Sequence, residues 1–448
     1  MTARKRTVPF LAALLALVCC GFTQPPAPPL HDADYLAFAD SVMAGLERTW
    51  DPAAGAYVTR RTGATARTNA NALIVHSAAA LLGGTGAARH DDRAHLLIAK
   101  MTHAPMLALS SGGWTKRTLC WTKQLTGGGR DHVSLDSQVA EALASAWRAR
   151  VALQLTGEET AAIRTAVDRC ARLRAWRFPH LLENQINWNA QLYASAAEIT
   201  GRTDQLRTTY RRYLVRFVRG LRRALPGWAA PNLGPGYGFH YDPDTPATRK
   251  HNFHAPEYSH IVATALQHYP AARRAGMKAL PGGSLPLLRH WVERMLYGDW
   301  THAGYLNWDT GLGRGRWHSG QYWAFAQQGL LAMAATPAIW PRSEAGAWAK
   351  ALFDRGLGLY ARWAAEGGEQ DGLAPQLPFG IWSEHRDHDL YASRMAANAV
   401  RAIGLGLGGA PAADPPALYD FDVESQRLAV STPAYSTAIV PHNQRAFP

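Results

Sequence analysis

Apolar residues recur every three to four positions along most of this 448-residue chain, which is the spacing of an amphipathic helix. They mark about a dozen segments, and each segment ends near Gly, Pro or Asn, residues that commonly stop a helix. The segments lie near residues 34–49, 67–83, 92–107, 134–156, 158–176, 187–200, 203–225, 255–270, 284–297, 317–336, 343–366 and 391–407. Strand-like alternation is nearly absent before residue 418. This pattern predicts an all-α main domain over residues 31–407.

The number of expected helices narrows the architecture. They are too many for a four-helix bundle, and the chain has no exact internal repeat of the kind that indicates a solenoid. We therefore predict an (α/α)6 toroid of helical hairpins.

Four longer connections, rich in Gly, Trp, Tyr and His, interrupt the helical pattern at 110–133, 226–254, 299–316 and 367–390. Long connections in a compact domain are usually functional or disordered. These four contain too many aromatic residues to be disordered, so we expect them to be functional. We expect them to lie on one rim of the toroid and to form the mouth of a cleft.

The two ends of the main domain differ from it in composition. Residues 408–418 are rich in Gly, Ala and Pro, as in a linker. Beyond them, Tyr419, Phe421 and Val423 alternate with acidic residues, which predicts a strand, and residues 427–440 allow two more. Because about thirty residues are too few for a β-sandwich, residues 419–448 resemble the start of an incomplete β domain.

Residues 1–30 have the pattern of a secretory signal peptide followed by a Pro-rich linker. Arg4, Lys5 and Arg6 precede an apolar run at 8–18, which is too short to span the ~30 Å of a bilayer core. We therefore expect a secreted protein without a membrane span. Lipid attachment through Cys20 is the alternative. Export would also permit a disulfide between Cys120 and Cys170, a question that the sequence leaves open.

The chain carries 47 Lys and Arg against 34 Asp and Glu, a formal charge of +13, and 47% of its residues are apolar. Such a composition supports a large core and excludes a disordered chain. The positive charge favours an anionic partner, and export makes nucleic acid an unsuitable one. No CxxC or HExxH motif is present, so we predict no metal and no other cofactor. We expect a monomer.

The first candidate site is the run Glu183-Asn184-Gln185-Ile186-Asn187-Trp188-Asn189. Asn187 fits an N-cap at a helix start, which is the structural alternative. However, three Asn, one Gln and a Trp within seven residues exceed what a cap needs. Side-chain amides of Asn187 and Asn189 can hydrogen-bond a sugar carboxylate.

The second candidate site is a segment dense in His and Tyr. Residues 234–242 contain Tyr237 and His240. His254 and Tyr258 follow within the next 16 residues. A lone His is usually structural, but this segment holds several. A metal site is the alternative, but the segment contains no recognisable spacing of metal ligands.

Two further groups contain Trp and Arg residues near helix starts. In the third candidate site, Trp308 and Trp317 are suited to stacking on sugar rings, and Arg316 to binding an anionic group, with His318 beside them. The fourth, at 382–394, has a similar composition. The Arg-rich segment 207–223 is more simply a solvated outer helix face.

An Asn near a helix start, then a Gly/Tyr/His segment about fifty residues later, then a Tyr, resembles the toroid-fold polysaccharide lyases, such as the chondroitin AC, hyaluronate and xanthan lyases. The resemblance implies that Asn187 binds a uronate carboxylate and that His240 and Tyr258 transfer the protons of β-elimination. It further implies substrate contacts from Arg316. This chain has a single Trp188 where the family has a Trp pair, and its spacing leaves His254 and Tyr237 as competing candidates.

The sequence thus predicts a secreted lyase that cleaves a uronate-containing polysaccharide. We expect Asn187, His240 and Tyr258 to be catalytic, and the predicted substrate-binding residues are Asn189, Tyr237, His254, Trp308, Arg316, Trp317 and His318. Two alternatives remain. A glycoside hydrolase on the same fold would need two facing carboxyl groups, for which Glu183, Asp242, Glu257, Asp309 and Asp371 are candidates. A noncatalytic glycan-binding protein would need only the Trp and Arg residues.

Overall fold

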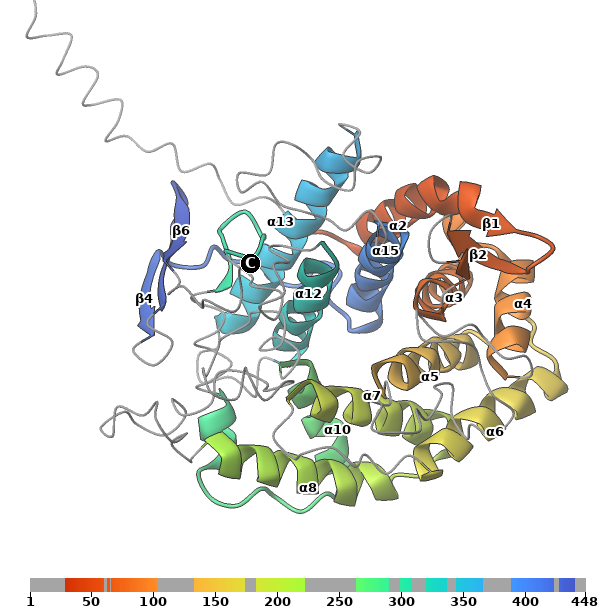
Figure 1. Cartoon of the computed structure of the whole chain (residues 1–448), viewed down its shortest axis with the longest axis horizontal. Coiled ribbons are helices and arrows are strands. Elements are labelled where there is room, and N and C mark those ends of the chain that lie inside the picture. The colour runs from red at the N-terminus through yellow and green to blue at the C-terminus, as the bar shows by residue number, and fades with distance from the viewer. Residues whose placement is uncertain are drawn as a thin grey trace, which may run out of the picture.

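The computed structural model describes residues 29–59, 63–64, 66–102, 133–173, 183–221, 263–289, 299–307, 320–336, 344–365, 388–422 and 427–439. Within these residues the protein is mostly helical, with a small three-stranded antiparallel sheet near its C-terminal end (Figure 1). Every helix that the apolar spacing predicts has a helical counterpart in the described part of the chain. The expectation of a mostly helical chain followed by strands is therefore confirmed.

The long helices are α2 (Asp32–Leu46), α3 (Ala66–Leu81), α4 (Asp91–Thr102), α5 (Val133–Arg148), α6 (Gly157–Leu173), α7 (Glu183–Thr200), α8 (Asp204–Leu221), α12 (Gly320–Ala335), α13 (Ala345–Ala365) and α15 (His388–Gly404). Residues 263–267 and 284–289 are also helical, and α10 (Tyr269–Arg274) follows the first of these. None of the helices in the described ranges is both long enough and apolar enough to cross a bilayer. The helix expected at 134–156 was predicted too long: α5 ends at Arg148, and turns follow it in which Gln154 adopts a left-handed conformation, with φ of 54°.

The helices fall into two groups by burial. In α3, α12 and α15 nearly every described position is buried, whereas α8 is buried on one face and exposes Arg207 and Arg212 on another. A helix buried on all sides lies inside the fold. Accordingly, α12, α15, α3, α5 and α7 pack against one another in that order, and α13, α2, α4 and α8 each pack against the outer side of one of them (Figure 1).

A second small sheet was not expected from the sequence. It contains β1 (Trp50–Asp51), β2 (Ala56–Thr59) and β3 (Gly63–Ala64), which pair in that order and connect α2 to α3. The near-absence of strand-like alternation before residue 418 therefore did not reveal this segment. Strands of two to four residues are too short to show an alternating pattern, and the turn between β1 and β2 is marked mainly by Gly55, whose φ is +56°.

The C-terminal strands are β4 (Leu418–Asp422), β5 (Arg427–Ser431) and β6 (Ser436–Ile439), which form an antiparallel meander. The residues before them, predicted to be a linker, contact the helical body. Gly409 N donates to Leu30 O at 2.9 Å, Ala413 N donates to Ala347 O at 3.2 Å, and Asp414 pairs with Arg355. The sheet is thus fixed to the helices at its base.

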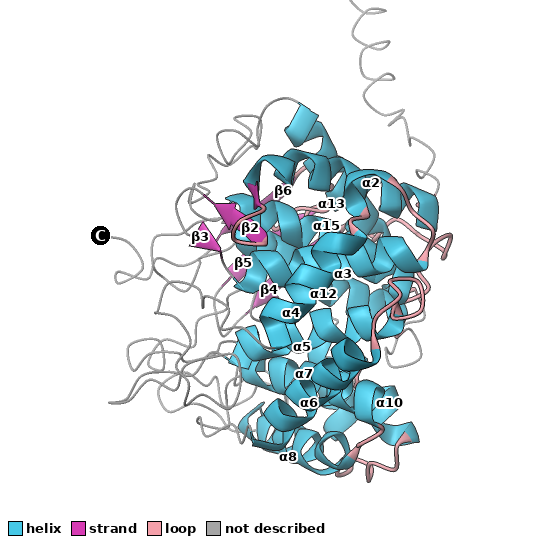
Figure 2. Cartoon of the chain, turned by 90° about the vertical axis from the view of Figure 1, so that its right-hand side faces the viewer, coloured by secondary structure: helices cyan, strands magenta, loops and turns pink. Residues whose placement is uncertain are grey.

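The sheet is also held by the segment that precedes α12. Asn307 is buried, and its Nδ2 donates to Val430 O at 3.2 Å and to Thr437 O at 3.0 Å. Both small sheets lie on the same side of the helical body (Figure 2). Because β3 leads into α3 and residues 299–307 precede α12, this is the side of the N-terminal ends of these two inner helices.

Candidate functional site

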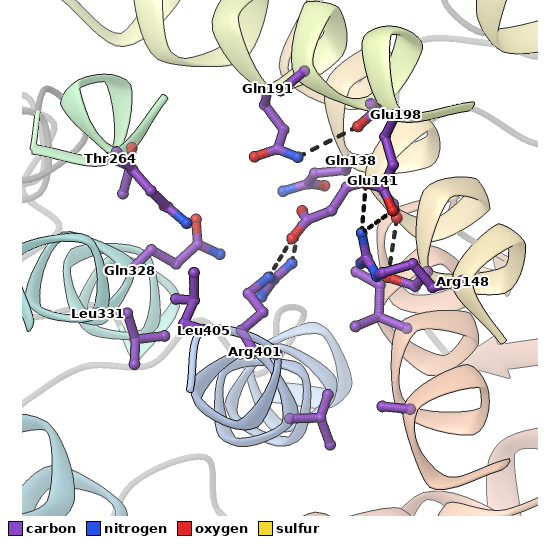
Figure 3. Close-up of a pocket in the computed structure, with 18 of the residues that line it drawn as sticks. Gln138, Glu141, Arg148, Gln191, Glu198, Thr264, Gln328, Leu331, Arg401 and Leu405 are labelled. Atoms are coloured by element: carbon purple, nitrogen blue, oxygen red, sulfur yellow. Dashed lines mark hydrogen bonds and ion pairs between the residues drawn. The ribbon is translucent and has the colours of Figure 1, made fainter. Parts of the chain in front are cut away.

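The inner helices enclose a pocket of about 420 Å³, which falls within the range of roughly 300–1,000 Å³ of small-molecule sites (Figure 3). Its walls come from α3, α5, α7, α12 and α15, and from the helical segment 263–267 with the adjacent His268. Apolar side chains such as Leu331 and Leu405 alternate with amides and charged groups around it. The pocket therefore has the mixed lining of a ligand site.

Polar stripes on two otherwise buried helices supply most of this lining. On α5 the stripe is Ser137, Gln138, Glu141, Ser145 and Arg148, and on α7 it is Asn187, Gln191, Ser195 and Glu198. These spacings of three and four residues place each set on one helix face. The stripe on α5 lies between fully buried apolar residues, including Leu143 and Ala146.

The four charged side chains of the pocket form two ion pairs. Arg401 on α15 donates to both carboxylate oxygens of Glu141, at 2.6 and 3.0 Å, and its Nη1 donates to Asn398 Oδ1 at 2.8 Å. Arg148 likewise donates from Nη1 to Glu198, at 3.0 and 2.7 Å, in a more exposed position. Two carboxylates and two guanidinium groups leave the lining without net charge, in contrast to the strongly basic chain as a whole.

Three buried polar atoms of the lining have no hydrogen-bond partner among the described residues: Ser77 Oγ, Gln138 Oε1 and His268 Nε2. Most buried polar atoms in proteins are paired, so unpaired ones need an explanation. Burial lowers the pKa of His268 to about 4, although the nearby Glu141 acts in the opposite direction. His268 is therefore neutral at pH 7 and can accept or donate a hydrogen bond.

Asn187 is the predicted catalytic residue that lines this pocket. It is 6% exposed, and it lies in the second turn of α7, because the helix begins at Glu183 rather than near Asn187. The N-cap interpretation of Asn187 is therefore wrong. The structure places Asn189 differently: it is fully buried, Tyr193 Oη lies 3.4 Å from its Oδ1, and it is not part of the pocket lining. Residues two positions apart on a helix do not share a face.

The other predicted site residues lie outside the described residues. They are Tyr237, His240, His254, Tyr258, Trp308, Arg316, Trp317 and His318. The predicted signal peptide and Cys120 also lie outside them, so the disulfide with the buried Cys170 stays a prediction. From the fourth group, Tyr391 and Arg394 are buried on α15, where the Arg394 guanidinium lies 3.3 Å from the centre of the Phe325 ring.

The Arg-rich helix α8 has a structural contact. Arg211 donates from Nε and Nη2 to the carbonyl oxygens of Lys278 and Ala279, at 2.9 to 3.2 Å, and so holds the turn after α10. Arg207 and Arg212 are exposed, as expected for an outer face. Across the described ranges, no three His, Cys, Asp or Glu side chains come together as a possible metal site.

Sequence reasoning missed Gln138, Glu141, His268 and Arg401 because each lies within a helical pattern rather than in a recognisable motif. The polar stripe on α5, set in a helix whose other faces are apolar, was the available signal. No family model, curated protein or solved structure matches the chain.

Proposed function

We propose that the protein is a secreted polysaccharide lyase that cleaves an acidic, uronate-containing glycan by β-elimination. The observation that carries this proposal is the position of Asn187, a buried amide in the second turn of an inner helix that lines a pocket between the inner helices. The resemblance to toroid-fold lyases assigns binding of the uronate carboxylate to this residue.

The packing of the helices supports a toroid as the finer description of the fold. The row α12, α15, α3, α5 and α7, with residues 264–268 bordering the same pocket, provides six inner segments. The outer helices α13, α2, α4, α6 and α8 each pack against this row. We propose that these two layers are the inner and outer rings of an (α/α)6 toroid.

The chemistry of the proposed reaction follows from the substrate. The proton next to a uronate carboxylate becomes acidic when amide or cationic donors neutralise the carboxylate and stabilise the enolate-like charge of the transition state. Asn187 would donate to the carboxylate, His240 would remove the proton, and Tyr258 would protonate the leaving glycosidic oxygen. The positive charge of the chain would attract the polyanion.

An assay with a panel of uronate polysaccharides tests the proposal. β-Elimination gives an unsaturated uronate at the new non-reducing end, which absorbs in the ultraviolet. A rise in that absorbance with at least one glycan supports the lyase. New reducing ends without the absorbance would instead show a hydrolase, and binding without cleavage would show a noncatalytic protein. Either outcome would refute the proposed reaction.

A further inference from the structure

The pocket between the inner helices lies nearer to one end of these helices than to the other. Its lining comes from the middle and C-terminal parts of α3 (residues 74–81), α12 (328 and 331) and α15 (400–404), and from Thr264, Gln267 and His268. Segments that all present their C-terminal parts to one pocket run the same way around it. The pocket therefore lies toward the end opposite the two small sheets, and α5 and α7 reach deeper into it with Ser137 and Asn187.

This end of the helices favours hydrogen-bond donors. The last carbonyl groups of these helices carry negative partial charge, although several of them, such as Ala79 O and Ala402 O, accept hydrogen bonds from the turns that follow α3 and α15. Gln138 Oε1 adds an acceptor, and neutral His268 and Ser77 can each either accept or donate. All three of these side chains are more than nine-tenths buried, and all three line the pocket.

The two ion pairs of the lining offer no free charge to a ligand. The carboxylates and guanidinium groups of the lining are already paired with each other, so neither an anion nor a cation finds a free counter-charge among the described lining residues. This part of the lining therefore favours a neutral ligand, whereas the uronate contact proposed for Asn187 lies at the deeper end of the pocket. The half-buried ring of Trp188 and the side chains of Leu331 and Leu405 offer an apolar surface next to the polar atoms.

We propose that this pocket binds a neutral, hydroxyl-rich small molecule of the size of a mono- or disaccharide. Its hydroxyl groups would pair with Gln138, His268 and Ser77, and the apolar face of a sugar ring would lie against Trp188 or the leucines. The site lies toward the end of the inner helices opposite the two small sheets. The proposal does not depend on the lyase activity.

Isothermal titration calorimetry on the full chain tests this site. The titrants are D-glucose, D-galactose, N-acetylglucosamine and cellobiose, with D-glucuronate and D-glucosamine as charged counterparts. We expect saturable binding of at least one neutral sugar and weaker binding of both charged ones. No binding by any neutral sugar, or tighter binding of a charged one, would overturn the proposal, since the unpaired atoms would then be satisfied by water or by a different ligand class.

Variants locate the binding. Ala78 lines the pocket on α3, and Ala166 is an equally half-buried alanine on α6 outside it. Ala78→Phe should lower the affinity at least about tenfold, whereas Ala166→Phe should leave it unchanged. Gln138→Leu should also lower it about tenfold, because a sugar hydroxyl loses its partner. If Ala78→Phe does not fold, Gln138→Leu decides alone. Wild-type affinity in a folded Gln138→Leu or Ala78→Phe variant would place the sugar elsewhere and refute the site.

Discussion

Arg401 on α15 and Glu141 on α5 are 260 positions apart in the chain, yet two parallel hydrogen bonds of 2.6 and 3.0 Å join their side chains. Both side chains are mostly buried, with exposed fractions of 12% and 17%. Paired donors of this kind fix the orientation of both groups. This pair therefore connects the last inner helix to one near the beginning of the fold, across the wall of the pocket.

Removing one partner of this pair should strongly destabilise the protein. Arg401→Leu leaves the Glu141 carboxylate buried without its counter-charge, and we expect a loss of about 3 kcal/mol in the free energy of unfolding. Arg148→Leu is the matched control, since its pair with Glu198 is 47% and 36% exposed and should contribute less than about 1 kcal/mol. Urea unfolding followed by circular dichroism measures both. Equal losses in the two variants would contradict this account.

Buried neutral histidines should make the protein less stable in mild acid. Burial lowers the pKa of both His76 and His268 to about 4. Nε2 of His76 accepts from Tyr57 Oη and its Nδ1 donates to Ala88 O, each at 2.8 Å, as a neutral ring requires. The unfolded chain binds protons from about pH 6.5 downward and the folded chain does not, so stability is lost as the pH falls from 6.5 toward 4.

The size of this effect can be measured on His268. A group shifted from 6.5 to about 4 reduces the unfolding free energy by about 2 kcal/mol at pH 5. His268→Leu should therefore lose less stability than the wild type between pH 7 and pH 5, by about that amount. Glu47 titrates below this window, because hydrogen bonds and charge from Arg93 lower its pKa although burial acts in the opposite direction. Parallel pH profiles for variant and wild type would refute the assignment.

The C-terminal sheet should depend on one side chain of the helical body. Asn307→Ala removes the two donors to Val430 O and Thr437 O, and we expect local opening of β5 and β6 to become easier by about 1–2 kcal/mol. Hydrogen exchange of the β5 and β6 amides should then speed up by about tenfold, while exchange in α3 stays unchanged. Thr437→Ala is the control, because it retains the accepting carbonyl group. If the control speeds exchange as much as Asn307→Ala, Asn307 does not hold the sheet.

The sequence predicted the helices well because burial of an apolar face repeats over several turns. It predicted α15, for example, from residues 391–407, within a few positions of His388–Gly404. The start of α7 was missed, because the polar run before Asn187 resembles a cap, although Glu and Gln are good helix formers. The polar run alone cannot distinguish a cap before the helix from the first turn of the helix, because the difference depends on the neighbouring helices that pack against it.

The candidate pocket could not be predicted in the same way. Its ion pair joins residues far apart in the chain, and His268 lies at the end of a short helical segment that looks ordinary in sequence. Asn187 was found because amides cluster around it, and Gln138 was missed because it lies within an amphipathic helix pattern without a recognisable motif. Only the packing of α5 between α3 and α7 brings these groups to one pocket.

Unpaired polar atoms in the pocket should reduce the stability of the free protein. Gln138 is 6% exposed, and its Oε1 has no partner among the described residues. Gln138→Leu removes an unsatisfied acceptor at similar volume, so we expect the unfolding free energy to stay unchanged or to rise by about 1 kcal/mol. Gln191→Leu is a suitable comparison, because Gln191 Nε2 has a partner in Ser195 Oγ at 3.4 Å. A loss of more than about 2 kcal/mol in Gln138→Leu would mean that this atom has a structural partner.

The position of Asn187 leads to a prediction for the proposed elimination. Asn187→Ala should lower kcat/KM on the preferred uronate glycan by about 10²–10³-fold, since an amide that neutralises the carboxylate acts most strongly as charge develops. Part of this loss should appear in KM, because the carboxylate is also held in the ground state. Asn189→Ala is the control: it should mainly lower stability, because Asn189 is fully buried and is not part of the pocket lining. Full activity in a folded Asn187→Ala variant would show that this residue takes no part in the reaction.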